Sequence, residues 1–445
     1  MKNKTFLIVI SMMLTVITAK SQMWITQNVN PINDGYNFTS VSVVDSNIVW
    51  GVGATVDTNY WEGRQYISRT LDGGNTWISN ALNTDWWVTS FQAFSADTAW
   101  MSTTLKSPVL TTNVVYPALR KTTDGGQTWI QNTNIPLDSN SFCDFIHFFN
   151  TNEGLAFGDV HNGTWEAYYT TDGGLNWSLA DSVPNVINGE VVHDNTHYVL
   201  GNCIWATSTF GRVFYSFDKG RKWHASPVAS FQFPQMFRVA FFDQLEGIAV
   251  RYNCNTYLTG SVYQTHNGGK SWTLTPHTGH AFLAYPDGGL FVVPGSHIVI
   301  SNGGGVAKYG SSFSSDYGAT WTKIDSLQRY GAIDGKGWNS LWAGQYSNNL
   351  GVGGIAKWNG SFLSINDLSS NVDFSVYPNP SNGKLNISSS GKIDNLEIIN
   401  ILGEIIYQTK PEVNNFSLQL DEAGIYFVRG ISDKQILIKK LIVAH

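Results

Sequence analysis

One octapeptide recurs six times in the middle of the chain, and it limits the folds that the chain can adopt. The copies read TLDGGNTW, TTDGGQTW, TTDGGLNW, SFDKGRKW, THNGGKSW and SSDYGATW, and they begin at Thr70, Thr122, Thr170, Ser216, Thr265 and Ser314. Successive copies are 46 to 52 residues apart. A repeat of this length indicates an architecture in which one structural unit is stacked several times.

Each copy contains the residues that a tight hairpin needs. An Asp or Asn side chain accepts backbone N–H bonds across the turn, a glycine takes a positive φ, and the final Trp resumes the strand. We therefore predict structural roles for the residues at the third position, which are Asp72, Asp124, Asp172, Asp218, Asn267 and Asp316.

A second pattern precedes each octapeptide: an apolar strand, a turn rich in Asp and Asn, and another apolar strand. It occupies 41–53, 91–101, 145–158, 191–201, 239–250 and 282–293, and a seventh copy at 330–344 lacks the octapeptide. Two strand pairs per unit make one four-stranded propeller blade. Trp24-Ile25-Thr26 resembles the Trp-Ile after the first two octapeptides, so we expect this segment to complete the last blade. The prediction is a seven-bladed β-propeller, with six or eight blades as alternatives.

Composition supports an all-β fold. The chain has 43 Gly but 13 Pro, and 42% of its residues are hydrophobic against 13% charged. This balance favours short strands joined by tight turns and excludes disorder. The formal net charge is −6 although the first 21 residues are basic, which argues against binding nucleic acid through its phosphates.

The two ends of the chain indicate export. Residues 1–21 have the features of a secretory signal peptide, with Lys2 and Lys4, an apolar run, and Ala19-Lys20-Ser21 as the cleavage site. The apolar run is shorter than a membrane-spanning helix needs, and no later segment is long enough, so we predict no membrane span after cleavage. From residue 376 the composition changes to short strands without Trp, which predicts a small Ig-like β-sandwich. The expected domains are a propeller at 22–366, a linker at 367–375 and the sandwich at 376–445.

The octapeptide resembles the Asp box of BNR-repeat β-propellers, a family that includes sialidases, sortilin-type receptors, xyloglucanases and photosystem II assembly-factor-like propellers. Four of the six copies fit its S/T-x-D-x-G-x-T/N-W pattern. The resemblance implies that the box is structural and lies away from the ligand face.

The tail resembles the type A C-terminal sorting domain of the type IX secretion system of Bacteroidetes. The resemblance rests on Tyr377-Pro378-Asn379-Pro380, Gly403, Gly424-Ile425-Tyr426 and Lys439-Lys440-Leu441. It implies that the type IX secretion machinery recognises the tail and delivers the protein to the medium or the outer-membrane surface, after which the tail is removed. An ordinary Ig-like adhesion module is the alternative.

We expect the ligand to bind at the loops of one propeller face and at the mouth of its channel. Aromatic residues on loops offer stacking surfaces for a glycan or a protein partner. The candidate ligand-binding residues are Trp61, Arg64, Trp86, Trp87, Asp144, Trp165, Tyr168, Glu190, Arg238, His280 and Tyr330.

The leading hypothesis is binding without catalysis, and the alternative is a surface glycoside hydrolase. Arg238 is not followed by the proline of the sialidase arginine motif, which disfavours sialidase activity. A xyloglucanase-like enzyme needs two carboxylates about 5 to 9.5 Å apart, and no spacing selects a pair among Glu62, Asp85, Asp144 and Glu190. We predict no cofactor and no metal site, because the sequence has no Cys/His cluster and no phosphate-binding glycine loop.

Overall fold

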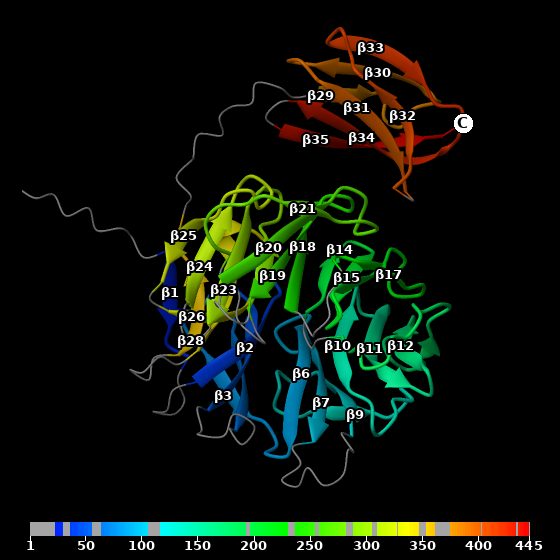
Figure 1. Cartoon of the computed structure of the whole chain (residues 1–445). Helices are drawn as coiled ribbons and strands as arrows, with labels where there is room; N and C mark the ends of the chain where they lie inside the picture. Colours follow the sequence, from blue (N-terminus) through cyan, green and yellow to red (C-terminus); the bar gives the residue numbers. More distant parts are fainter. Residues whose placement is uncertain are drawn as a thin grey trace, which may run out of the picture.

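The computed structural model describes residues 23–29, 36–55, 64–105, 116–192, 196–229, 236–253, 258–281, 288–304, 309–326, 328–346, 353–360, 374–401, 403–432 and 435–444. The chain is all-β, as the sequence predicts. A ring of sheets forms the larger part, and the red and orange strands of the C-terminal domain lie against one face of it (Figure 1).

The described residues from Trp24 to Trp358 form seven four-stranded antiparallel sheets, each with its strands in chain order except the one that β1 completes. The first three are β2 (Tyr36–Val43), β3 (Val49–Thr55), β4 (Gln65–Thr70) and β5 (Ile78–Ala81); β6 (Trp86–Ala93), β7 (Ala99–Leu105), β8 (Ala118–Thr122) and β9 (Ile130–Asn132); and β10 (Cys143–Phe148), β11 (Gly154–His161), β12 (Thr164–Thr170) and β13 (Ser178–Leu179). The next three are β14 (Tyr198–Leu200), β15 (Cys203–Thr207), β16 (Arg212–Ser216) and β17 (His224–Pro227); β18 (Met236–Phe241), β19 (Gly247–Asn253), β20 (Leu258–Thr265) and β21 (Thr273–Thr275); and β22 (Leu290–Val292), β23 (Val299–Gly304), β24 (Tyr309–Ser314) and β25 (Thr322–Asp325).

The seventh sheet joins the two ends of the repeat region. Its strands are β26 (Arg329–Gly335), β27 (Leu341–Tyr346), β28 (Gly354–Trp358) and β1 (Trp24–Gln27), and one 3₁₀ turn (Trp338–Ser340) separates β26 from β27. The β1 strand is antiparallel to β28, with Trp24 opposite Trp358 and Gln27 opposite Ile355. The predicted pairing of the N-terminal segment with the last sheet is confirmed. It covers a strand edge that would otherwise be open to other chains.

The Asp boxes form the predicted turns. In the first, the Asp72 carboxylate accepts the backbone N–H of Thr76 at 2.9 Å and the hydroxyls of Thr76 and Thr70 at 2.6 and 2.8 Å. Gly73 and Gly74 have φ values of 70° and 97°, which glycine adopts without strain. These hydrogen bonds, led by the Thr76 hydroxyl, lower the pKa of Asp72 to about 2. At each of the other five boxes the third-position side chain likewise accepts the backbone N–H of the seventh residue.

The box tryptophans are less uniformly buried than the sequence suggests. Trp223 and Trp321 are 2% and 6% exposed, but Trp77, Trp129 and Trp177 are only partly buried. They pack at the margins of the apolar clusters between neighbouring sheets, while tryptophans of the second strands, such as Trp50 and Trp205, fill the centres of the clusters.

The C-terminal domain contains two sheets around its own core. One consists of β29 (Phe374–Tyr377), β30 (Lys384–Ser389) and β33 (Asn415–Gln419), and the other of β32 (Ile405–Thr409), β31 (Asn395–Asn400), β34 (Gly424–Ser432) and β35 (Gln435–Val443). Alternate strand residues such as Leu385, Leu396, Ile398, Val428 and Leu441 are fully buried between the sheets. This alternation is typical of a two-layer sandwich.

Candidate functional site

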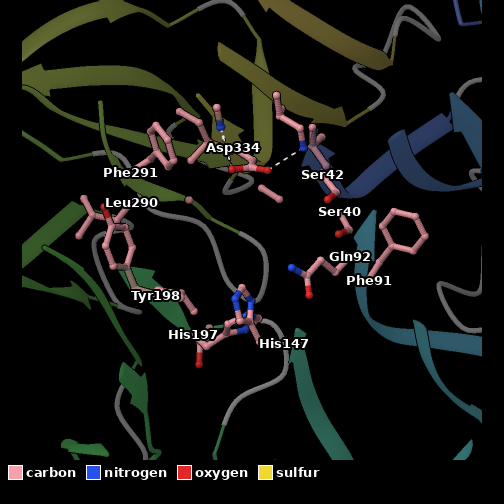
Figure 2. A pocket seen from close by; sticks show the side chains of 18 of the residues that line it. Ser40, Ser42, Phe91, Gln92, His147, His197, Tyr198, Leu290, Phe291 and Asp334 are labelled. Carbon is pink, nitrogen blue, oxygen red and sulfur yellow. Dashed lines mark hydrogen bonds between the residues drawn. The ribbon is translucent and has the colours of Figure 1, made fainter. Parts of the chain in front are cut away.

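The first strands of the seven sheets surround a central cavity of about 490 Å³ (Figure 2). Each first strand, or the residues directly before it, contributes to the wall. Polar and aromatic side chains from separate sheets lie around the space, including Ser40, Gln92, His147, His197, Tyr198, Arg238, Phe291, Asp334 and Lys336. The volume lies within the usual range for small-molecule sites.

Several polar groups of the wall hold neighbouring sheets together. The Gln92 amide donates to the Phe148 carbonyl at 3.0 Å and accepts the Phe148 N–H at 2.7 Å, which joins the second and third sheets. The Arg238 Nε donates to the carbonyl of Gly288 at 2.8 Å, and the Tyr198 hydroxyl donates to that of Phe241 at 3.0 Å. Satisfied polar groups of this kind fix the positions of the strands around the channel.

Two histidines form the most distinctive polar feature of the wall. The His147 and His197 rings are 5.8 Å apart, and His197 also stacks on Phe145 at 4.7 Å. Burial lowers the pKa of His197 to about 4, and burial together with the neighbouring His197 lowers that of His147 well below its usual value. Both imidazoles are therefore neutral near pH 7. Among the described residues, the buried His197 Nδ1 has no hydrogen-bond partner.

A carboxyl group faces the histidines across the cavity (Figure 2). Asp334 accepts the backbone N–H of Val43 at 2.7 Å and that of Gly335 at 2.8 Å, so it joins the seventh sheet to the first. Burial raises the pKa of Asp334, and the charge of Lys336 opposes that shift. Among the described residues that line the cavity, Asp334 is the only carboxylic acid.

The cavity lies toward the end of the channel where the Asp boxes are. Its lining residues fall in the later parts of β2, β6, β10 and β26, just before the turns that lead to the second strands. In each of the first five sheets a box residue donates its backbone N–H to that turn, for example Gly73 to Asn47 at 3.0 Å. The resemblance to BNR propellers implies a ligand face away from the boxes. This cavity lies at the box end of the channel instead, because the boxes and the turns beside the cavity share one end of the sheets.

Five of the candidate ligand-binding aromatics lie on strands rather than in the loops where the sequence placed them. Trp86 and Trp87 are on β6, Trp165 and Tyr168 on β12, and Tyr330 on β26. Trp87, Trp165 and Tyr330 are at most 7% exposed, because strand alternation turns these rings into the cores between sheets. Trp86 is partly buried under the Arg120 guanidinium, 3.7 Å from its ring, and Tyr168 is partly exposed.

The remaining candidates are dispersed. Glu190 is buried and forms an ion pair with Arg212, and Asp144 is buried on β10. Arg64 and His280 are exposed, and Trp61 lies outside the described residues. Arg238 alone of the eleven lines the central cavity.

Sequence reasoning missed His147, His197 and Asp334 as a group. They come from three different sheets, so no local spacing connects them. The available signal was a polar residue within an apolar inner strand, as in Phe145-Ile146-His147-Phe148, where period-two alternation points His147 toward the channel.

Comparison with known proteins supports both parts of the chain. Residues 375–444 match the family model of the secretion system C-terminal sorting domain, and residues 168–179 match the BNR/Asp-box repeat. Both resemblances expected from the sequence are confirmed. The C-terminal domain is thus a type IX sorting domain, which indicates export to the cell surface or beyond. No curated protein matches the chain.

Solved structures of similar fold include propellers. YCF48 bound to D1 peptide has 17% identity and a TM-score of 0.49, with 76% of this chain and 97% of that chain covered. The GH74 xyloglucanase from Xanthomonas campestris has 10% identity and a TM-score of 0.38, covering 90% and 79%. PorZ, a type IX surface component of Porphyromonas gingivalis, has 11% identity and a TM-score of 0.33, covering 92% and 81%.

Two further properties concern the described part of the chain. None of its helices has the length and apolar character that crossing a membrane requires. Across the same residues, no group of three or more His, Cys, Asp or Glu side chains is arranged to hold a metal ion.

The neutral state of His197 predicts a pH dependence of stability. Its folded pKa of about 4 lies below the ordinary value of 6.5, so the unfolded chain binds more protons between these values. The stabilisation is complete above pH 6.5 and is lost as the pH falls toward 4. His197→Phe should remove this contribution. Denaturant unfolding of both proteins at several pH values measures it. The difference between them reports His197 together with its effect on the pKa of the neighbouring His147, because Asp243, with a pKa of about 6, titrates in both.

Proposed function

We propose that this protein is an exported seven-bladed β-propeller that binds the terminal sugar of a glycan in its central channel. In this proposal residues 1–21 are a signal peptide, residues 22–366 the propeller, residues 367–375 a linker and residues 376–445 an Ig-like sorting domain. The sorting-domain match supports the export step. The seven four-stranded sheets and the pairing of β1 with β28 support a closed ring of seven blades.

The observation that carries the binding proposal is the polar and aromatic wall of the cavity, which also contains Arg238, Asp334 and Lys336. His147 and His197 offer uncharged nitrogens for hydroxyl groups, and Phe291 and Tyr198 offer ring faces nearby. Sugars combine hydroxyl groups with an apolar ring face, so they suit a wall that combines polar groups with aromatic rings.

A glycoside hydrolase remains the second candidate, and the cavity favours binding over it. Glycoside hydrolysis requires two carboxyl groups on either side of the scissile bond. Asp334 stands alone among the described lining residues, and both of its oxygens accept backbone N–H groups. We therefore propose recognition without cleavage. A protein partner at the aromatic loops is a further alternative, for which Trp61, Arg64 and His280 remain predicted contacts.

A glycan array tests the proposal. The full chain should bind a restricted set of glycans, and His197→Phe should weaken that binding by about fivefold, because one lost buried hydrogen bond costs on the order of 1 kcal/mol. Phenylalanine preserves the stack on Phe145 while removing both ring nitrogens. His280→Ala is the matched control, since His280 is exposed and outside the cavity. Absence of glycan binding, or equal binding by His197→Phe, would contradict the proposal, and release of free sugar would favour the hydrolase.

A further inference from the structure

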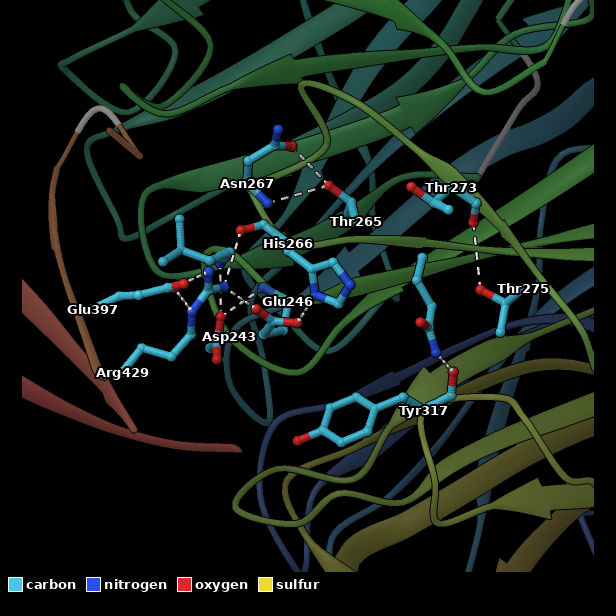
Figure 3. Close-up of polar contacts among 12 residues, drawn as sticks. Asp243, Glu246, Thr265, His266, Asn267, Thr273, Thr275, Tyr317, Glu397 and Arg429 are labelled. Atoms are coloured by element: carbon cyan, nitrogen blue, oxygen red, sulfur yellow. Dashed lines mark hydrogen bonds and ion pairs between the residues drawn. The ribbon is translucent and has the colours of Figure 1, made fainter. Parts of the chain in front are cut away.

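A buried group of charged residues joins the sorting domain to the propeller (Figure 3). Arg429 of β34 lies at its centre. Its Nη1 donates to the Glu246 carboxylate at 2.6 Å and to the His266 carbonyl at 3.3 Å, and its Nε donates to Glu397 at 2.7 Å. Glu246 and His266 belong to the fifth sheet of the ring, whereas Glu397 and Arg429 belong to the sorting domain.

The sorting domain presents Arg429 on the outer face of its sheet. Arg429 lies directly opposite Glu397 of β31, and the adjacent Val428 points into the sandwich core. An outer sheet face is normally exposed to water. Here the side chains of Arg429 and Glu397 are only 9% and 6% exposed, because the propeller covers them. The propeller therefore shields the Arg429 guanidinium from solvent at this face.

The propeller supplies a preformed acidic notch, which we define as Asp243, Glu246 and the His266 carbonyl. Asp243 accepts the backbone N–H groups of Leu245 and Glu246 at 2.7 and 2.8 Å, which fixes the turn between β18 and β19. The Nδ1 of His266 lies 2.5 Å from the second oxygen of Glu246 and orients that carboxylate. The remaining oxygen of Glu246 faces Arg429.

A second contact lies next to the notch. Gly403, in the turn between β31 and β32, approaches the fifth Asp box so closely that an added Cβ would lie 3.2 Å from Lys270 Nζ and 3.8 Å from the Asn267 carbonyl. Gly403 has a φ of 80°. Two contacts on one face of the domain define an orientation, which a single ion pair would not.

We propose that the acidic notch of the fifth blade is a guanidinium-binding site whose ligand is Arg429, so that the sorting domain is docked on the propeller instead of moving freely on its linker. Burying the Glu246 carboxylate without the Arg429 guanidinium would leave a buried charge without its partner, which is strongly unfavourable, so the notch and Arg429 depend on each other. The partner is this chain's own C-terminal domain. It is recognised through Nη1 of Arg429, which bonds both Glu246 and the His266 carbonyl while Nε is held by Glu397.

Backbone ¹⁵N relaxation of the full chain with a labelled C-terminal domain tests docking. If the domain is docked, its amides have the rotational correlation time of the whole molecule. Glu246→Gln should shorten that time by roughly twofold or more, because a domain on a short polar linker moves independently once its contact is lost. Arg429→Ala should do the same.

Glu246→Gln is the decisive variant because it leaves the sorting domain itself unchanged. Lys384→Ala is the control, since Lys384 is an exposed residue of the other sheet of the domain and should leave the relaxation unaltered. Two results would overturn the proposal: a wild-type sorting domain that tumbles faster than the propeller, or a Glu246→Gln protein with unchanged relaxation.

Discussion

Replacing Trp24 by Ala is expected to lower the free energy of unfolding of the propeller by about 3 to 5 kcal/mol, the usual cost of truncating a fully buried Trp. The Trp24 ring is 1% exposed and lies 4.9 Å from Trp358 and 5.6 Å from Tyr330. Its indole N–H donates to the Ser311 hydroxyl of the sixth sheet at 3.0 Å. The substitution therefore removes packing within the seventh sheet and a hydrogen bond to its neighbour.

Ile25→Ala is the matched control for this experiment. Ile25 is the next residue of the same strand, but it points outward and is 42% exposed. Its truncation should change stability by about 0.5 kcal/mol or less. Denaturant unfolding followed by tryptophan fluorescence measures both variants. Equal, small effects would show that the N-terminal strand does not contribute to the closure of the ring.

Removing the chain after Asn371 is expected to abolish export across the outer membrane and leave the protein in the periplasm. The deleted part contains the whole sorting-domain match at 375–444. Immunoblots of periplasm, outer membrane and medium from the native host measure the distribution, with full-length Lys384→Ala as the control that is still exported. Normal amounts of truncated protein on the surface or in the medium would refute the sorting role.

The truncated propeller should remain folded even though the structure shows more contact between the domains than its short linker suggests. Complete removal of the sorting domain exposes Glu246 to water, where the carboxylate is solvated and no longer needs Arg429 as its cation. The truncation therefore avoids the penalty of an isolated buried charge. Circular dichroism and thermal unfolding of the truncated protein check this expectation.

The fold was predictable to the extent that it depends on local sequence. The Asp-box turn uses an Asp, two glycines and a Thr within a few residues, so its hydrogen bonds follow from spacing alone. The position of Trp24 in the last sheet was predictable, because Trp24-Ile25 repeats the Trp-Ile pair at which other outer strands start. Strand limits were harder to predict: Trp165 and Tyr330 lie near the starts of the seven-residue strands β12 and β26, although the sequence pattern places them in loops.

The site was not predictable because it is assembled from separate sheets. His147 and Asp334 are 187 residues apart and meet only when the ring closes. The contact of Arg429 with Glu246 spans 183 residues and depends on how two domains pack. In both cases the residue types are ordinary, and their surroundings determine their burial.

The most direct test of the channel proposal is hydrogen–deuterium exchange of the full chain with and without a glycan that the array identifies. We predict slower exchange in the inner strands that carry or adjoin the two histidines, β10 at Cys143–Phe148 and β14 at Tyr198–Leu200. His197→Phe should lose this protection at the same glycan concentration. Protection confined to the segments around Arg64 and His280, with the inner strands unchanged, would contradict the proposal and place the ligand at the loops.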